Sequence, residues 1–260
     1  MGELLVKREG AVGTLLFSNV ARHNAMSYSM WHEFPERLQE LDTDPNVRVI
    51  VLAGDGDKAF VSGADISQFK ENRAEEGMQQ AYDRALVTAF GAPSGCEKPV
   101  IAKIRGFCMG GGLGIAAGCD IRICSNDAVF RMPAARMGLG YPFPSAQKFV
   151  ALIGVANAAD IFFTARRFDA TEAQRMGFVQ RVTSIEDLDA AVAEYCAMIA
   201  GNAPLAVASA KRSIIEAGRD ENRRDMNAVM GLIEAASESE DHEEASAAFM
   251  EKREPVFKGR

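Results

Sequence analysis

Apolar residues near the start of the chain recur first at strand spacing and then at helix spacing. The segment from Leu4 to Ser18 predicts two short strands joined by a glycine turn, at Gly10 or Gly13. The next segment, "SYSMWHEFPERLQELDTDP", predicts a helix that is capped near Ser27 and ends before Pro45. Its apolar side chains recur every three or four residues, at Met30, Phe34, Leu38 and Leu41.

Three later runs of β-branched and apolar residues predict buried strands. They are "VRVIVLAG" (Val47 to Gly54), "PVIAKI" (Pro99 to Ile104) and "DIRICS" (Asp120 to Ser125). A helix is expected between the last two runs, starting near Gly112. This alternation of strands and helices is typical of α/β proteins.

After about Thr183 the strand pattern ends and helix-forming residues dominate, with a break at Gly201 to Pro204. The acidic segment "ESEDHEEAS" is typical of a solvated helix start. We find no repeat of fixed period and no low-complexity linker. The sequence therefore predicts an α/β spiral core over residues 1–200, followed by a helical C-terminal region over residues 201–260.

Composition narrows the possible partners and compartment. The chain has 260 residues, of which 48% are hydrophobic, and this is enough for a large core. Its net charge of −7 argues against a general nucleic-acid binder. The start lacks an apolar signal core, and no segment reaches the roughly 18 uninterrupted apolar residues of a membrane span. We expect a cytoplasmic protein without a membrane partner, with reduced and buried thiols at Cys96, Cys108, Cys119, Cys124 and Cys196.

Two glycine-containing stretches are candidates for binding an anion. They are "GFCMGGGLGIAAGCDI" (Gly106 to Ile121) and "KAFVSGADISQF" (Lys58 to Phe69). Glycine permits a positive φ and lets another group approach the backbone N–H closely. Two such N–H groups aimed at one oxygen would stabilise the oxyanion formed when a thioester becomes an enolate or a tetrahedral adduct. Tight packing between strand and helix explains either turn taken alone.

Other uses of the glycines and histidines have little support. The pattern Gly112-x-Gly114-x-x-Ala117 fits a loose dinucleotide fingerprint, but the next strand begins at Asp120 and leaves too short a crossover. No Gly-Lys-Ser/Thr follows a glycine loop, and no Gly-x-Ser-x-Gly elbow exists. The histidines show no metal-ligand spacing; they are His23, His32 and His242. We therefore expect no nucleotide cofactor and no metal.

Five blocks resemble the crotonase (enoyl-CoA hydratase/isomerase) superfamily in order and spacing over nearly the whole chain. They are "RHNAMS", "AFVSGADI", "KPVIAKIRGFCMGGGLGIAAGCDIRIC", "FFTARRFDATEAQRMGFVQRV" and "FMEKREPVFKG". The resemblance implies a crotonase-like ββα spiral core with a helical C-terminal oligomerisation region. It also implies an enzyme for an acyl-CoA thioester, whose oxyanion hole consists of the N–H groups of Ala64 and Gly111. No separate cofactor is implied, because CoA enters as part of the substrate.

The same resemblance implies which residues of this chain would contact CoA. The segment from Arg22 to Ala25 would flank the nucleotide, and the backbone of Ala64, Asp65 and Ile66 would meet the adenine.

Residues near the end of the chain would contribute to the CoA-binding site of a neighbouring subunit. By resemblance, Phe249 and Lys252 would reach the neighbour's CoA, since the C-terminal helices of the family pack in a trimer that is often doubled to a hexamer. From the residues alone, Phe249 is a core aromatic at helical spacing and Lys252 is a surface charge. A homotrimer or hexamer is the expected assembly.

The chain departs from the family at two positions that matter for the reaction. Hydratases of the family carry two glutamates, one shortly after the triple glycine and one just after the proline of the next turn. Here these positions are Gly114 and Ala134. Hydration needs a base for water and an acid at the α-carbon, and each such group contributes about 10²- to 10⁴-fold. Efficient hydration is therefore doubtful, although the backbone hole would remain.

Other side chains near these blocks leave the reaction open. Tyr141 falls where methylmalonyl-CoA decarboxylases of the family place a tyrosine, although an aromatic residue in a Gly-Tyr-Pro turn also packs for structural reasons. Arg136 could pair with a substrate carboxylate or with a surface acid. Asp65 and Asp120 could act in catalysis, or hold their turns through hydrogen bonds to backbone groups.

Three functions are compatible with the sequence. The first is an acyl-CoA enzyme, a lyase or isomerase, with altered proton-moving groups. The second is a decarboxylase-like lyase that uses Tyr141. The third is a non-catalytic acyl-CoA-binding protein.

Overall fold

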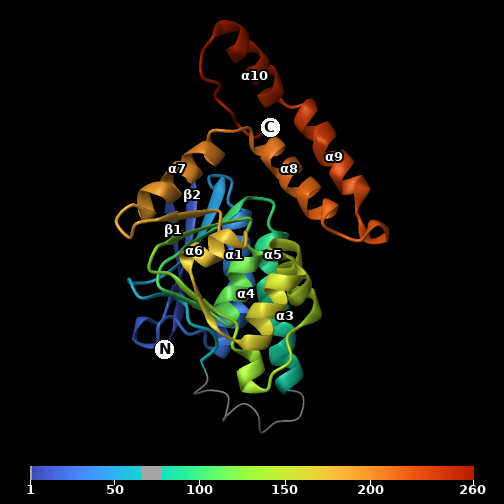
Figure 1. Cartoon of the computed structure of the whole chain (residues 1–260). Helices are drawn as coiled ribbons and strands as arrows, with labels where there is room; N and C mark the ends of the chain where they lie inside the picture. The colour runs from blue at the N-terminus through green and yellow to red at the C-terminus, as the bar shows by residue number, and fades with distance from the viewer. Residues whose placement is uncertain (1, 66–77) are drawn as a thin grey trace.

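A computed structural model describes residues 2–65 and 78–260 of the chain. Its larger sheet has six strands in the order β1-β2-β3-β5-β7-β10 (Figure 1). The first two strands form the expected antiparallel hairpin, and the other neighbours pair in parallel. The strands are β1 (Glu3–Glu9), β2 (Val12–Ser18), β3 (Val49–Gly54), β5 (Val100–Ile104), β7 (Ile121–Ser125) and β10 (Arg181–Thr183).

Both faces of the central strand β3 are buried. On β3, Ile50 and Leu52 belong to the main hydrophobic core, while Val49 and Val51 face a second cluster. That second cluster is completed by α7 (Leu188–Ala200). A run of apolar residues without polar alternation is expected for such a strand, because neither of its faces meets water.

A smaller sheet of four strands adjoins the first, in the order β4-β6-β8-β9. Its parallel members β4, β6 and β8 each follow one strand of the larger sheet, so that a strand pair and then a helix recur along the chain. This arrangement confirms the α/β class and the ββα spiral. A strand end was expected before the first glycine turn, where β4 lies, but the other strands of this sheet were not predicted, because three residues are too few to show alternation. The strands are β4 (Ala59–Val61), β6 (Phe107–Met109), β8 (Val129–Arg131) and β9 (Arg167–Asp169).

The expected first helix is confirmed as α1 (Tyr28–Asp42). Its four spaced apolar residues are buried, and the Ser27 hydroxyl accepts a hydrogen bond from the N–H of Met30 at 3.3 Å. The other core helices are α3 (Met78–Gly95), α4 (Gly111–Gly118), α5 (Phe143–Thr164) and α6 (Ala170–Arg175). Short 3₁₀ turns are η1 (Val20–Arg22), η3 (Ala134–Met137) and η4 (Glu221–Arg223).

Helix α4 is enclosed by the core, and glycines permit this close packing. A Cβ built on Gly112 would lie 2.2 Å from the Val61 carbonyl oxygen. A Cβ on Gly118 would lie 2.3 Å from the Phe90 carbonyl oxygen. Two of the six glycines in the glycine-rich stretch therefore let α4 approach β4 and α3 directly, without binding anything.

Helix α5 is interrupted at Gly154, where φ is 75° and ψ is 163°. By length and composition alone, α5 could cross a membrane. Its buried residues, including Phe149, Ile153 and Ile161, pack against the core of this fold.

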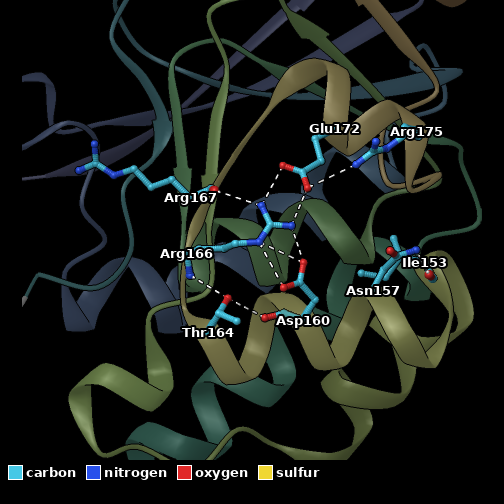
Figure 2. Close-up of polar contacts among 8 residues, drawn as sticks. All are labelled: Ile153, Asn157, Asp160, Thr164, Arg166, Arg167, Glu172 and Arg175. Atoms are coloured by element: carbon cyan, nitrogen blue, oxygen red, sulfur yellow. Dashed lines mark hydrogen bonds and ion pairs between the residues drawn. The ribbon is translucent and has the colours of Figure 1, made fainter.

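An ion-pair network joins the end of α5 to β9 and α6. Figure 2 shows the Arg166 guanidinium between Asp160 of α5 and Glu172 of α6. The arginine lowers the pKa of both carboxyl groups through hydrogen bonds. Because about a third of the Arg166 side chain is exposed, solvent screens the pairs and their contribution to stability is modest.

Only helices follow β10 in the part of the chain that the structure describes, as expected. Besides α7, they are α8 (Pro204–Ala217), α9 (Met226–Ser237) and α10 (Glu240–Glu251). In Figure 1 these orange and red helices extend away from the core, and α8 lies beside α9. Lys211 anchors α8 through an ion pair with Asp120 at 2.8 Å. The acidic segment forms the start of α10, where Ser239 is the N-cap.

Candidate active site

The two glycine-containing turns meet at one edge of the smaller sheet. They follow β4 and β6, whose carboxyl ends lie side by side because the strands are parallel. Gly63 (φ 115°) and Gly110 (φ 53°) both adopt positive φ. A Cβ built on Gly110 would lie only 3.9 Å from the Cα of Gly63. The structure therefore brings together the two turns that the sequence analysis singled out.

Backbone pairing orients the first turn. The N–H of Met26 donates to the Gly63 carbonyl and the N–H of Asp65 donates to the Met26 carbonyl, both at 2.8 Å. In such a parallel bridge the N–H of the central residue, Ala64, points away from Met26. Within residues 2–65 and 78–260 this N–H has no hydrogen-bond partner.

The second turn leads directly into α4, whose first residue is Gly111. The first N–H groups of a helix have no partner inside the helix. The N–H of Gly111 finds none elsewhere in the described residues either. The two predicted donors are thus both available, at the ends of adjacent strands.

Aromatic rings cover the start of α4. A Cβ on Gly111 would lie 2.5 Å from the Trp31 ring, and a Cβ on Gly114 would lie 2.8 Å from the Phe90 ring. Trp31 and Phe90 meet edge to face, with centroids 5.8 Å apart. Gly114 and Ala134 offer no titratable group, and Phe90 fills the volume next to Gly114. The sequence analysis missed both rings because α1 and α3 bring them to the site from distant parts of the chain.

Tyr141 is part of the same aromatic cluster. Its ring stacks on Phe90 with centroids 6.2 Å apart and meets Phe162 edge to face at 4.9 Å. Its hydroxyl is buried without a hydrogen-bond partner in the described residues. Burial also raises the pKa of Tyr141, so the hydroxyl stays protonated at neutral pH. The group can donate a hydrogen bond but is a poor base.

The other predicted polar groups have structural partners or lie at the surface. The Asp65 carboxylate accepts hydrogen bonds from Arg22 at 2.7 and 2.6 Å. Asp120 accepts from the N–H of Val100 and pairs with Lys211. Arg136 is exposed on η3. Among the described residues no cluster of His, Cys, Asp or Glu could hold a metal ion.

The segment expected to flank CoA lies beside the first turn. The N–H of Ser62 donates to the His23 carbonyl at 3.1 Å. Asn24 is buried and its amide donates to the Asp55 and Ala59 carbonyls. Arg22 is exposed, whereas Ala25 is buried. Ile66 falls outside the described residues.

The two residues predicted at the chain's end lie on α10 and at its C-cap. Phe249 has 82% of its surface exposed, so its interpretation as a core aromatic is wrong for the single chain. Lys252 is also exposed and has a positive φ of 56°. Both residues are available to a neighbouring molecule.

The five cysteines are free and buried, as expected. Burial raises the thiol pKa to about 12 for Cys96, Cys119 and Cys124. Thiols that stay protonated are poor nucleophiles.

Comparison with known proteins matches residues 7–260 to the enoyl-CoA hydratase/isomerase family. The peroxisomal Delta(3,5)-Delta(2,4)-dienoyl-CoA isomerase of Arabidopsis thaliana is 33% identical, over 96% of this chain and 93% of the relative. The short-chain-enoyl-CoA hydratase of Clostridium acetobutylicum is 34% identical, over 97% of this chain and 96% of the relative.

Solved structures agree with these relatives. The crystal structure of an enoyl-CoA hydratase/carnithine racemase from Magnetospirillum magneticum superposes with a TM-score of 0.92 at 33% identity, covering 99% of this chain and 96% of that one. An enoyl-CoA hydratase/isomerase from Marinobacter aquaeolei gives a TM-score of 0.89 at 28% identity, covering 98% of both chains.

Proposed function

Since this chain belongs to the enoyl-CoA hydratase/isomerase (crotonase) family, we propose that it binds the thioester carbonyl of an acyl-CoA between the N–H groups of Ala64 and Gly111. One observation carries this proposal. The turns at Gly63 and Gly110 lie side by side, and the N–H that follows each of them has no partner in the described residues. Two backbone donors at one place fit an oxygen that gains negative charge.

The chemistry that such a site supports is enolate stabilisation. When a bond at the α-carbon breaks and its electrons remain on the acyl group, the charge moves to the thioester oxygen. Removal of one donor from an oxyanion hole typically costs about 2.7 to 4 kcal/mol in the transition state. The relatives named above are enzymes, and we propose a lyase or isomerase reaction for this chain.

Hydration fits this site poorly. Gly114 and Ala134 supply neither a general base nor a general acid. The Phe90 ring beside Gly114 also occupies space that a longer side chain at position 114 would need. We therefore propose that the chain is a slow hydratase at best.

A decarboxylase-like reaction is the second candidate, and Tyr141 favours it. In that reaction the bond between the α-carbon and a carboxylate breaks, CO₂ leaves, and the electron pair forms the enolate, which is then protonated at the α-carbon. No base is needed to begin. The buried Tyr141 hydroxyl remains a donor and lacks a partner within the described residues, so it could orient the substrate carboxylate.

A third candidate is a protein that binds acyl-CoA without turnover. The same backbone donors would then hold the thioester, and the missing acid and base would have no consequence. The test below separates this candidate from the other two.

We propose further that CoA lies along Arg22, Ala25, Ala64, Asp65 and Ile66. The Arg22–Asp65 pair supports this placement, because it sets a cation beside the first turn. No separate cofactor is needed, and we propose a cytoplasmic location.

The assembly that we propose is a homotrimer or hexamer in which the C-terminal helices meet a neighbour. Their exposed apolar side chains support it, since such surfaces are usually covered. These side chains include Ile214, Met230, Ile233, Phe249 and Met250. Phe249 and Lys252 would then lie at the neighbour's CoA.

Thermal unfolding with added compounds tests the ligand class. Acetoacetyl-CoA should raise the melting temperature, because a compound at 100 times its Kd adds about 2.7 kcal/mol. NADH and ATP should have little effect. A shift with NADH and none with the thioester would contradict the proposal.

The reaction is tested with malonyl-CoA and methylmalonyl-CoA. Release of CO₂ that falls in Tyr141→Phe, with thioester binding unchanged, would support the decarboxylase. Tight binding without turnover of these compounds or of crotonyl-CoA would support the non-catalytic protein.

A further inference from the structure

The segment from Asn19 to Met26 lies against the first glycine turn and sets its orientation. The N–H of Ser62 donates to the His23 carbonyl at 3.1 Å. Two further backbone hydrogen bonds form the parallel bridge between Met26 and Ala64. The turn that contains the Ala64 N–H is therefore held by a segment that is distant from it in sequence.

The side chain of Asn24 fixes this segment. It is 1% exposed, and in the described residues it makes three hydrogen bonds, all to backbone groups. Its Nδ2 donates to the Asp55 carbonyl at 2.9 Å and to the Ala59 carbonyl at 2.8 Å. Its Oδ1 accepts from the N–H of Asn19 at 3.0 Å. Since Asp55 follows β3 and Ala59 begins β4, one amide ties the segment to both ends of the β3–β4 connection.

The surroundings fit an asparagine amide closely. Gly54 ends β3 beside it, and a Cβ built on Gly54 would lie 2.8 Å from Nδ2 of Asn24. The nitrogen of the amide faces two carbonyls and its oxygen faces an N–H, so both ends meet complementary groups. A carboxylate in the same place would set an oxygen against the two carbonyls. The contacts therefore distinguish asparagine from aspartate, although the two side chains have nearly the same shape.

The backbone conformation is independent evidence that this position is constrained. The φ angle is 56° at Asn24 and 51° at His23. Residues other than glycine rarely adopt such values, and asparagine tolerates them better than most. Strained conformations of this kind persist only where surrounding contacts hold them, and they cluster at functional sites.

The constraint at Asn24 reaches the oxyanion hole through Met26. Met26 lies two residues after Asn24, and the Ala64 N–H lies between the two residues, Gly63 and Asp65, that hydrogen-bond to Met26. A shift of the segment would therefore turn the Ala64 N–H. Hydrogen bonds weaken steeply when their angle departs from linear, and a donor in an oxyanion hole must be aimed before the charge forms.

We propose that Asn24 is a positioning residue, whose amide aims the N–H of Ala64 at the thioester oxygen. It acts through Met26 and the first glycine turn, without touching the acyl group. This inference rests on the proposed function, because it takes the thioester carbonyl to lie between Ala64 and Gly111.

Calorimetric titration of two ligands that differ only at the carbonyl tests the inference. Butyryl-CoA has the thioester carbonyl, whereas S-butyl-CoA has a CH₂ group in its place. The native chain should bind butyryl-CoA about tenfold more tightly, since two hydrogen bonds together give a factor of this order. Asn24→Asp should lower this ratio to about threefold or less, as expected when one of the two hydrogen bonds is lost. The affinity for S-butyl-CoA should change little.

Asn157→Asp is the matched control, because it makes the same chemical change on α5. The Asn157 amide donates to the Ile153 carbonyl at 2.8 Å, so this variant also loses a hydrogen bond to a backbone carbonyl. It should keep the native ratio. Melting temperatures without ligand show which variants fold. If Asn24→Asp does not fold, Asn24→Gly takes its place, because glycine adopts a positive φ without strain but has no amide. The ratio should fall in the same way.

Each of the other outcomes contradicts a different statement. Equal affinity of the native chain for the two ligands would overturn the proposed function, and this inference with it. A native preference for butyryl-CoA that the Asn24 variants keep would overturn this inference alone. A ratio that falls as much in Asn157→Asp would reveal a general effect of lost stability, and would also overturn the role of Asn24.

Discussion

At the residue scale, Phe90 and Gly114 together decide what side chain position 114 can hold. The ring lies 2.8 Å from a Cβ built at position 114, so a longer side chain there would collide with it. A glutamate cannot simply be restored at this position. The glycine and the aromatic ring are therefore complementary in shape.

This relation predicts how hydration can be gained. Gly114→Glu with Ala134→Glu should show little crotonyl-CoA hydration while Phe90 is present, because the new carboxylate has no room. Adding Phe90→Ala should raise the rate about 10²-fold or more, the usual contribution of a positioned acid or base. Steady-state hydration assays measure the effect, with Phe90→Ala alone as the control. Equal gains with and without Phe90 would contradict it.

The buried thiols predict a loss of stability at high pH. Burial raises the pKa of Cys124 from 9.0 to about 12, so the unfolded chain releases this proton first as pH rises. The stabilising contribution is complete below about pH 9 and declines toward pH 12, by up to about 1.4 kcal/mol per pH unit for one thiol.

Urea unfolding between pH 8 and pH 11 measures this decline. Cys124→Ala should show a shallower fall in the free energy of unfolding over the same range. An identical slope in both proteins would show that the thiol does not titrate as described.

At the element scale, the sequence predicted the helices and strands that are long or strongly apolar. The hairpin, α1 and the strands β3, β5 and β7 follow from spacing and burial within single segments. The strands β6, β8 and β9 were missed because each has three residues. The two glycine turns could be singled out from their residues, whereas Phe90 and Trp31 could not, because only tertiary packing brings α1 and α3 to α4.

The contact between α3 and α4 gives a prediction at this scale. Gly118→Ala should destabilise the protein by about 1 to 3 kcal/mol, because the added methyl group meets the Phe90 carbonyl oxygen. Gly91→Ala on α3 is the matched control, since nothing lies within 4 Å of its Cβ. It should stabilise the helix by about 0.5 to 1 kcal/mol. Chemical denaturation compares them, and equal effects would contradict the close packing.

At the scale of the whole molecule, the C-terminal helices leave an apolar surface that the chain itself does not cover. Ile214, Phe249 and Met250 are each at least 73% exposed, and they lie on α8 and α10. We expect a trimer or hexamer at micromolar concentration by light scattering. Ile214→Glu with Phe249→Glu should shift the particle toward the monomer. A monomeric native protein would contradict the assembly and remove Phe249 and Lys252 from any neighbour's CoA.

The central claim is that two backbone N–H groups hold and polarise a thioester carbonyl in a site without an acid–base pair. Isotope-edited infrared spectroscopy of butyryl-CoA labelled with ¹³C at the thioester carbonyl measures this polarisation directly. Hydrogen bonds from Ala64 and Gly111 should move the carbonyl stretch of the bound thioester to lower frequency than in water. A bound thioester whose carbonyl stretch is unchanged, or moves to higher frequency as in an apolar pocket, would contradict the account.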